Sequence, residues 1–228
     1  MVCPCGPHGF RPVGFFCAMD RVVSFIDGFN LYHSIRNLGR PHLKWVDLWA
    51  LSEVFIRPKS EALVDVFYFS AYATWLPSAY RRHREYVAAQ IAVGVTPVMG
   101  HFKERDRICR QCGSRWVAHE EKETDVNIAV SLTRLAHKDA FDRALLITRD
   151  SDLAPALRAF KADFPAKSLT VVAPPSRSGH SSELIAAASS NKATIKERHL
   201  QRCLLPQVVT DAGGNVAARR PKEYEPAK

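Results

Sequence analysis

The 228-residue sequence lacks the features that would carry it into or across a membrane. No segment approaches the roughly 18 consecutive apolar residues that a bilayer-spanning helix needs. The chain also does not open with a basic stretch followed by an apolar run, which is the pattern of a secretory leader. We therefore expect a soluble, cytoplasmic protein with no membrane partner.

Several common enzyme motifs are absent as well. The sequence has no GxGxxG or GxxxxGKS/T motif, which argues against dinucleotide and P-loop nucleotide binding. It has no GxSxG motif, which argues against an α/β-hydrolase. A haloacid-dehalogenase type of phosphatase would need a second Asp two residues after Asp27, but Phe29 stands there. Asp27 is therefore a poor candidate for a covalent nucleophile.

The composition suits one folded domain with a polyanionic partner. Hydrophobic residues make up 46% of the chain, enough for one good-sized core, and the length is short for two full domains. The formal net charge of +9 fits a partner such as nucleic acid. Six unevenly spaced cysteines favour free thiols or metal ligands over a disulfide framework.

The two ends of the chain differ in composition from its middle. Residues 1–18 carry Pro, Gly and Cys without a period and precede Met19, so we expect a loose N-terminal arm or a mis-assigned start. Residues 207–228 are rich in small and charged residues, which predicts a disordered basic tail. The folded domain should therefore span residues 19–206.

Within residues 19–206, short apolar runs alternate with helix-like stretches. Runs such as "RVVSFI", "RALLIT" and "SLTVVAP" are continuously hydrophobic, as strands buried on both faces are. The pattern predicts an α/β three-layer sandwich with a central, mainly parallel sheet. Residues 103–122, with Cys109 and Cys112, interrupt the alternation with many charges and are expected to form a small inserted hairpin.

Acidic residues follow two of the expected strands. Asp27 ends "RVVSFID", and Asp150 follows "RALLITR", with Ser151 and Asp152 at the start of the next helix. In open α/β sheets, ligands bind beyond the carboxyl ends of the strands, where loops converge. Taken singly, each residue is better explained by a turn or a helix cap than by a functional role.

Asp125 falls in the first turn of a helix expected to start near Thr124, on one stripe with Ala129, Leu132 and Ala136. It should point toward the same end of the sheet if the helix runs antiparallel to the strands. A purely structural role, in which the carboxylate interacts favourably with the helix dipole, also explains it. Several carboxylates in one site repel and need a cation, and hard oxygen ligands favour Mg²⁺ or Mn²⁺.

Three segments, "FIDGFNLY", "EEKETDVNIAVSL" and "LLITRDSDLAPAL", resemble in order and spacing the NYN family, specifically its LabA-like bacterial branch within the PIN-like nuclease superfamily. The resemblance implies a PIN-like fold and a metal-dependent ribonuclease. It assigns metal binding to Asp27, Asp125 and Asp150, with Asn30 and Asp152 completing the catalytic cluster. The family has Ser-Gly before Asp150, whereas this chain has Thr148 and Arg149, so Arg149 would bind a substrate phosphate or restrict access.

The mechanism implied is hydrolysis of RNA phosphodiester bonds by a water that the bound ions activate. Two alternatives remain open: a regulatory RNA-binding protein that keeps the fold without turnover, and a metal-dependent nucleotide phosphatase. The basic surface favours a polymer over a small nucleotide.

Basic residues near aromatic ones indicate where single-stranded RNA would bind. One cluster is Arg81, Arg82 and Arg84, for which a solvated helix face is an equal explanation. The inserted hairpin is the better candidate and carries Lys103, Arg105, Arg107, Arg110, Arg115 and Trp116.

Cys109 and Cys112 have the spacing of half a structural zinc site, which needs four ligands. The remaining ligands would be His101 and His119, Cys3 and Cys5, or the same pair from a second copy in a homodimer. Two free thiols in a hairpin are the simpler alternative.

Overall fold

The computed structural model describes residues 19–175, 181–188 and 191–226. The predicted N-terminal arm, with Cys3 and Cys5, lies outside these residues. The strands are β1 (Asp20–Asp27), β2 (Glu61–Ala71), β3 (Thr96–Ile108), β4 (Arg115–Lys122), β5 (Arg143–Ile147), β6 (Ser168–Ala173), β7 (Lys192–Thr194), β8 (Val208–Thr210) and β9 (Val216–Arg219). The helices are α1 (Gly28–Arg36), α2 (Leu48–Glu53), α3 (Pro77–Ala92), α4 (Thr124–His137), α5 (Ala154–Asp163), α6 (Ser182–Ala187) and α7 (Glu197–Arg202), with 3₁₀ turns η1 (Pro41–Trp45), η2 (Ser151–Leu153) and η3 (Lys222–Tyr224).

The main sheet has seven strands in the order β4-β3-β2-β1-β5-β6-β7. Every neighbouring pair is parallel except β3 and β4. The predicted mainly parallel α/β fold is thus confirmed. From β1 the chain builds outward through β2 and β3, then returns to β5 on the other side of β1. The boundary between β1 and β5 is therefore a topological switch point, where such sheets bind ligands.

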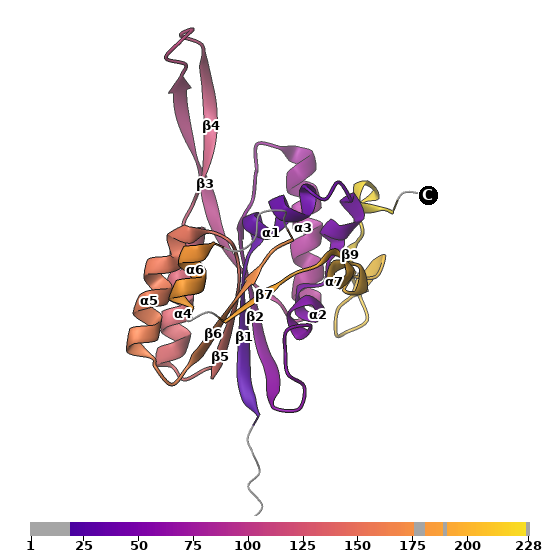
Figure 1. The fold of residues 1–228 in the computed structure, drawn as a ribbon. Coiled ribbons are helices and arrows are strands. Elements are labelled where there is room, and N and C mark those ends of the chain that lie inside the picture. The colour runs from indigo at the N-terminus through magenta and orange to yellow at the C-terminus, as the bar shows by residue number, and fades with distance from the viewer. Residues whose placement is uncertain (1–18, 176–180, 189–190, 227–228) are drawn as a thin grey trace, which may run out of the picture.

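Helices cover both faces of this sheet (Figure 1). Helices α4, α5 and α6 pack on one face, and α1, α2, α3 and α7 pack on the other. Alternate residues of β1 serve the two cores, since Val22 and Ile26 join the α1 side while Val23 and Phe25 join the α4 side. The same alternation directs Asp27, at the strand end, to the α4 side. None of the described helices is both long and apolar enough to cross a membrane.

Helix α4 shows the amphipathic spacing expected from the sequence, shifted by one residue in its first half. Its buried residues are Thr124, Ile128, Leu132 and Ala136, four apart along one face. Asp125 was expected on the buried stripe itself but is only half-buried at its edge. That position brings Asp125 into contact with the open end of the sheet rather than with the core.

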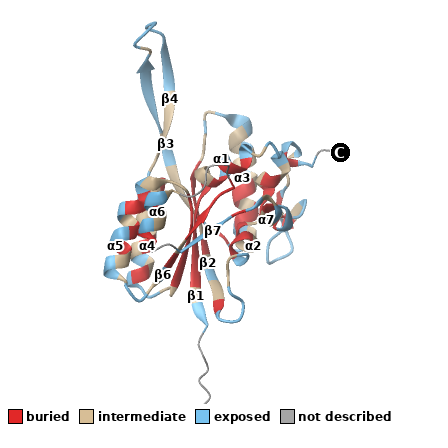
Figure 2. Ribbon diagram, in the orientation of Figure 1, coloured by how far each residue is buried: buried red, intermediate tan, exposed pale blue. Residues whose placement is uncertain are grey.

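Strands β3 and β4 form the predicted hairpin, which projects far beyond the body of the protein (Figure 1). Its outer half is exposed on both faces, in contrast to the buried central strands (Figure 2). At the root, a side chain on Gly100 would lie 2.5 Å from the carbonyl oxygen of Lys122, so glycine permits the close approach of the two strands there. The hairpin is thus an extension of the main sheet.

Residues 207–226 are folded, which corrects the prediction of a disordered tail. Strands β8 and β9 form an antiparallel hairpin that packs against α3, and Val209, Ala218 and Tyr224 are buried. Arg82 on α3 also forms an ion pair with Glu223 at 3.0 Å. The composition of the segment is polar on average, but residues alternate between two faces along each short strand, so Val209 and Ala218 reach the core while Val216 stays exposed.

Ion pairs close the amino end of the sheet, where the parallel strands begin. Arg21 binds both Asp142, at 2.8 Å, and Asp139, at 3.0 Å. Glu61, at the start of β2, is buried and pairs with Arg143 at 2.6 Å and also with Arg57. Every carboxylate named here has a basic partner.

Candidate active site

Asp27 lies at the carboxyl end of β1 and is only 4% exposed. It is the N-cap of α1, where its Oδ1 accepts a hydrogen bond from the backbone N–H of Asn30 at 2.9 Å. Its Oδ2 accepts a hydrogen bond from the Thr148 hydroxyl at 2.8 Å. Burial raises the pKa of Asp27 to about 6 despite these two hydrogen bonds, with smaller contributions from Asp125 and Asp150.

Thr148 connects the ends of β1 and β5. Its buried hydroxyl donates to Asp27 and accepts from the backbone N–H of Asp150 at 3.1 Å. The resemblance expects a serine here, which would supply the same hydroxyl, so Thr148 keeps this link. Asp150 is the N-cap of η2, with its Oδ1 accepting from the Asp152 N–H at 3.0 Å, while Asp152 itself is exposed.

Asp125 approaches the same place from α4. Burial, together with the smaller effect of the neighbouring charges of Asp150, Glu121 and Asp152, raises its pKa to about 6. Glu121, from the end of β4, accepts hydrogen bonds from the backbone and hydroxyl of Thr124. Sequence reasoning missed Glu121 as a site residue, although it lies in the same segment as Asp125.

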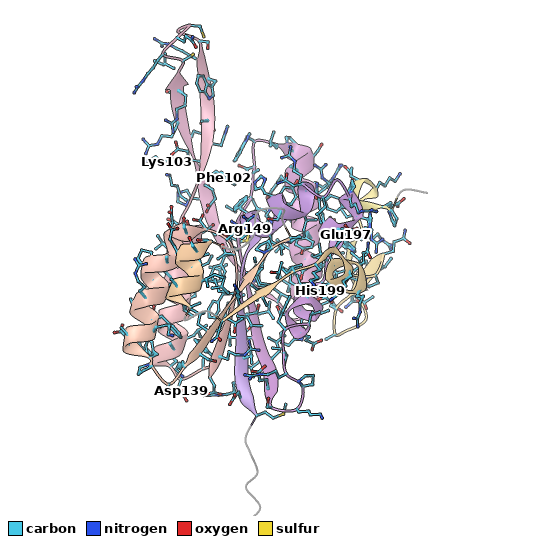
Figure 3. All side chains as sticks on the ribbon, in the orientation of Figure 1. Phe102, Lys103, Asp139, Arg149, Glu197 and His199 are labelled. Carbon is cyan, nitrogen blue, oxygen red and sulfur yellow. The ribbon has the colours of Figure 1, made fainter. Side chains whose placement is uncertain are left out.

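Asn30 and Arg149 join α1 to the loop after β5. The Asn30 Oδ1 accepts a hydrogen bond from the backbone N–H of Arg149 at 3.1 Å. This contact gives Asn30 a structural role that the sequence did not indicate. Figure 3 shows Arg149 at the carboxyl end of the sheet, near the root of the hairpin, with Asp139 at the opposite end.

These side chains line a cleft of about 400 Å³ at the switch point between β1 and β5. The structure thus brings together Asp27, Asn30, Asp125, Arg149 and Asp150, as the sequence predicts, and leaves Asp152 outside the lining. The cleft is also lined by Phe29, His33, Ser34, Asn37, Glu121 and Thr124.

The donor chemistry of this cleft fits a hard divalent cation. Carboxylates from three separate segments line it, and Asp150 contributes to the raised pKa values of both Asp27 and Asp125. As they are placed, no three His, Cys, Asp or Glu side chains among the described residues are close enough to hold a metal ion. A bound ion would offset the repulsion among these carboxylates, which adds to the effect of burial on the pKa values of Asp27 and Asp125.

The predicted arginine cluster on α3 lies outside this cleft. Arg82 is paired with Glu223, and Arg84 lies over the ring of Tyr80 at 5.7 Å. Neither these two residues nor Arg81 line the cleft. Sequence proximity of the three arginines therefore does not translate into proximity to the carboxylates.

The hairpin presents a basic face. Lys103, Arg105 and Arg107 are alternate residues of β3, so their side chains leave on one face with a repeat of roughly 7 Å. Arg105, Arg107 and Lys122 all share a single carboxylate, Glu120. The face is therefore positively charged along its length.

The other predicted hairpin cations, Arg110 and Arg115, are exposed near the tip. At the root, His119 stacks on Trp75 with ring centroids 3.7 Å apart. Phe102 packs edge-on against Trp75 and against Phe29, which lines the cleft. The aromatic contacts thus link the hairpin physically to the cleft.

Cys109 and Cys112 form a tight turn at the hairpin tip. The Gly113 N–H donates to the Cys109 carbonyl at 2.9 Å, and Gly113 takes a positive φ of 69°. A hydrogen bond with Ser114, and a smaller one with Cys109, lower the pKa of the Cys112 thiol to about 7. The turn therefore holds one thiol ready to ionise near neutral pH.

The two histidines proposed as further zinc ligands are not beside this turn. His119 pairs across the hairpin with Glu104 and stacks on Trp75, and Nδ1 of His101 lies 3.3 Å from a carboxylate oxygen of Glu123 at the root. These histidines therefore cannot bind the same ion as Cys109 and Cys112, because the length of the hairpin strands separates them from the tip. Cys3 and Cys5 lie outside the described residues.

Comparisons with known proteins agree with this architecture. A family model described as the NYN domain matches residues 21–192. The chain is 28% identical to the 6-hydroxy-3-succinoylpyridine 3-monooxygenase HspA of Pseudomonas putida (strain DSM 28022 / S16), over 83% of this chain and 71% of that protein. It also superposes on a protein of unknown function from Vibrio parahaemolyticus with a TM-score of 0.52 and 19% identity, over 82% of this chain and 97% of that chain. The latter likeness concerns the fold alone.

Proposed function

Because this chain belongs to the NYN domain family, a family with a nuclease fold, we propose that it is a metal-dependent ribonuclease. One observation carries the proposal: carboxylates from the ends of β1, β4 and β5 and from the start of α4 converge at the switch point of the sheet. Although the chain has a net charge of +9, most of the charged side chains that line this cleft are acidic.

Asp27, Asp125 and Asp150 would hold Mg²⁺ or Mn²⁺. When bound, the ion would polarise the scissile phosphodiester and lower the pKa of the attacking water. Thr148 and the Asn30 backbone fix the Asp27 carboxylate in one orientation, and Glu121 positions the first turn of α4 that carries Asp125. Asp152 acts from outside the cleft by adding negative charge near Asp125.

Single-stranded RNA would reach the cleft along the basic face of the hairpin. Lys103, Arg105 and Arg107 are spaced along that face, and the exposed Trp116, opposite Arg107, offers a ring for base stacking. Arg110 and Arg115 extend the charge to the tip, and Arg149 would contact a phosphate beside the carboxylates. This path of the RNA does not require Arg81, Arg82 or Arg84.

The cysteine turn at the hairpin tip would hold half of a structural zinc site. With His101 and His119 removed as ligands, four thiolates from two copies of the turn would complete the tetrahedral set. This arrangement makes zinc binding and homodimer formation one event, because neither copy has the full ligand set in its hairpin tip.

A second candidate function is an RNA-binding regulatory protein without turnover. The observation that favours it is Arg149, which lines the cleft at a position where the resemblance expects glycine. If Arg149 restricts access, the Arg149→Gly variant should cleave RNA where the unmodified protein does not.

The proposed activity is tested by incubating labelled single-stranded RNA with the purified protein in Mn²⁺. Cleavage should disappear in EDTA and in Asp27→Asn, but persist in Asp139→Asn, a carboxylate change at the amino end of the sheet. RNA that is bound but left intact under all conditions would favour the regulatory function. Release of phosphate from a nucleoside monophosphate, with RNA left intact, would indicate the nucleotide phosphatase instead.

A further inference from the structure

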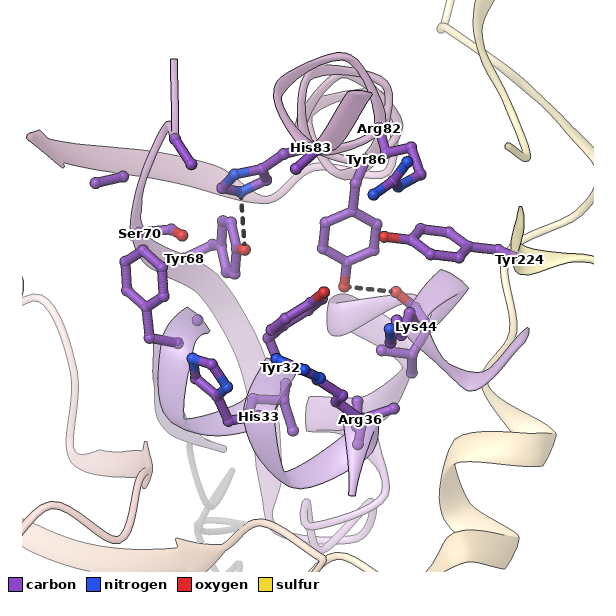
Figure 4. A pocket seen from close by; sticks show the side chains of 18 of the residues that line it. Tyr32, His33, Arg36, Lys44, Tyr68, Ser70, Arg82, His83, Tyr86 and Tyr224 are labelled. Carbon is purple, nitrogen blue, oxygen red and sulfur yellow. Dashed lines mark hydrogen bonds between the residues drawn. The ribbon is translucent and has the colours of Figure 1, made fainter. Parts of the chain in front are cut away.

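A second cavity lies on the other side of α1 from the carboxylate cleft. It has a volume of about 290 Å³ and is enclosed by α1, the carboxyl end of β2, α3 and η3 (Figure 4). Phe29 and His33 line both cavities, so they form the wall between them. Its volume is close to the lower limit of known small-molecule sites.

Four tyrosine rings line this aromatic pocket, and hydrogen bonds hold two of them, Tyr68 and Tyr86, in position. Figure 4 shows Tyr32, Tyr68, Tyr86 and Tyr224 turned toward a common space. The Tyr68 hydroxyl is 3.1 Å from Nε2 of His83, and the Tyr86 hydroxyl donates to the Val46 carbonyl at 2.9 Å. Because these hydrogen bonds fix the rings of the floor, a ligand would enter a preformed pocket with little ordering cost.

Gly28 explains why the pocket directly adjoins Asp27. A side chain at Gly28 would lie 2.5 Å from Cε2 of Tyr68 and 2.6 Å from the carbonyl oxygen of Phe69. Glycine therefore lets the start of α1 lie against β2, with the Tyr68 ring beneath it. Of this Asp-Gly pair, Asp27 lines the carboxylate cleft and Gly28 lines the aromatic pocket.

The charge of the pocket is positive. Arg36, Lys44 and Arg82 line it, and no Asp or Glu is among its described lining residues. Arg82 is offset by Glu223, but in the described part of the chain Arg36 and Lys44 take part in no ion pair. Lys44 lies over the ring of Tyr32 at 4.9 Å and over that of Tyr224 at 5.7 Å. An anionic group at this position would therefore meet two available cations.

The other ionisable groups of the pocket do not offset this charge. Burial lowers the pKa of His83 to about 4 and raises the pKa values of Tyr68 and Tyr86, so all three are neutral near pH 7. Burial and the neighbouring Arg36 and Lys44 also lower the pKa of His33. The cations act in an otherwise uncharged aromatic surrounding.

We propose that this pocket binds a single planar heteroaromatic ring that carries an anionic group. The rings of Tyr32 and Tyr224 stack on the ligand, and Lys44 and Arg36 bind its anion. In an RNA substrate the ring is one unstacked base with its phosphate, seated one wall away from the carboxylates. The choice of a nucleotide as the source rests on the proposed function, whereas the shared chemistry of ring and anion does not.

The test is a titration of the full chain, in EDTA, with ligands that separate ring from anion. Adenosine 5′-monophosphate and uridine 5′-monophosphate carry both parts, adenosine carries the ring alone, and ribose 5-phosphate carries the anion alone. Pyridine-3-carboxylate represents a free heteroaromatic acid. Calorimetry should show binding of a ligand with both parts and at least roughly tenfold weaker binding of either part alone.

Variants assign the binding to this pocket. Tyr32 is 38% exposed, so its replacement should not disturb the core. Tyr32→Leu should weaken binding roughly tenfold, whereas Tyr32→Phe keeps the ring and should retain it. Lys44→Gln should weaken binding roughly tenfold as well. Lys138→Gln, at an exposed position after α4, is the charge-matched control and should bind like the unmodified protein.

Each outcome decides the proposal. Absence of binding by all ring-and-anion ligands, or equal binding by Tyr32→Leu, would overturn it. Binding of the nucleotides identifies RNA or a free nucleotide as the source, and binding of pyridine-3-carboxylate alone identifies a small aromatic acid. The RNA cleavage assay separates this proposal from the proposed function. Ligand binding without RNA cleavage by the unmodified protein would support the pocket and contradict the nuclease, and cleavage without ligand binding would do the reverse. Asp125→Asn, which changes only the carboxylate cleft, should retain ligand binding.

Discussion

The two ends of the central sheet treat carboxylates in opposite ways. At the amino end, hydrogen bonds from Arg21 lower the pKa of Asp142 to about 2. Burial alone would raise the pKa of Glu61, but hydrogen bonds from Arg57 and Arg143 outweigh it and lower the pKa. At the carboxyl end, burial and neighbouring carboxylates raise the pKa values of Asp27 and Asp125 to about 6. Arginine side chains neutralise the carboxylates at the amino end of the sheet, whereas the carboxylates at the carboxyl end lack such partners among the described ion pairs.

This difference supports the proposed metal site at the carboxyl end of the sheet. The chain carries 32 basic residues, and it places several of them against carboxylates elsewhere in the same sheet. Among the described residues that line the cleft, four are acidic and one is an arginine. A surplus of acidic side chains in a partly buried site opposes folding by mutual repulsion, which the proposed cation would offset.

The largest stability effect should come from the amino end. Glu61→Gln removes a buried carboxylate and leaves Arg143 buried without its ionic partner. We expect a loss of about 3 to 5 kcal/mol in the free energy of unfolding. Urea denaturation would measure it, and a loss below about 1 kcal/mol would show that the amino end does not depend on ion pairing.

A change of similar chemistry at the carboxyl end should act on activity instead. Asp125→Asn should lower Mn²⁺-dependent RNA cleavage by roughly 100- to 1,000-fold, because a charged group that supports the reaction is lost. Asp139→Asn, at the amino end, is the control and should cleave at the unmodified rate. Cleavage by Asp125→Asn at that same rate would separate the carboxyl end from catalysis.

Asp27→Asn should stabilise the metal-free protein. The pKa of Asp27 in the folded protein, about 6, lies above the ordinary value of 3.8. Above pH 6 the ionised carboxylate therefore destabilises the folded state. Asparagine keeps the N-cap without the charge, and we expect a gain of about 1 to 2 kcal/mol at pH 8 and none at pH 4. Thermal unfolding in EDTA measures this, and destabilisation at pH 8 would contradict the reasoning.

The smallest effect should be the metal dependence of the melting temperature. Groups with a raised folded pKa contribute most stability below their unfolded pKa and lose it as pH rises through about 6, so the metal-free protein should become less stable between pH 4 and pH 7. Millimolar Mg²⁺ or Mn²⁺ should raise the melting temperature by about 2 to 4 °C at pH 8 and by less at pH 5. An equal shift at both pH values would place the ion elsewhere.

Much of the fold and the carboxylate site could be predicted because their signals are local. A continuous apolar run ending in Asp27 or Asp150 marks both a strand and the edge where it ends, and parallel strands bring such edges together. The spacing within α4 likewise predicts which face of the helix is buried. These inferences need no knowledge of which distant residues meet.

The features that were missed or misread depend on contacts between distant segments. Tyr32, Tyr68 and Tyr224 look like ordinary core residues in the sequence, and only the packing of η3 against η1 brings Tyr224 into one pocket with the other two. The structural role of the Asn30 side chain could not be read from its position, since its partner is in the loop after β5. The folded tail was misjudged because average composition hides three buried apolar side chains.

Tyr224 also has a practical consequence for how this protein is handled. The family match ends at residue 192, and a fragment trimmed to residues 19–206 would keep every carboxylate of the cleft. Such a fragment would nevertheless lose one wall of the aromatic pocket and the Glu223 partner of Arg82. Expression boundaries for this chain should therefore follow its side-chain contacts, and an affinity tag should be separated from η3 by a flexible spacer.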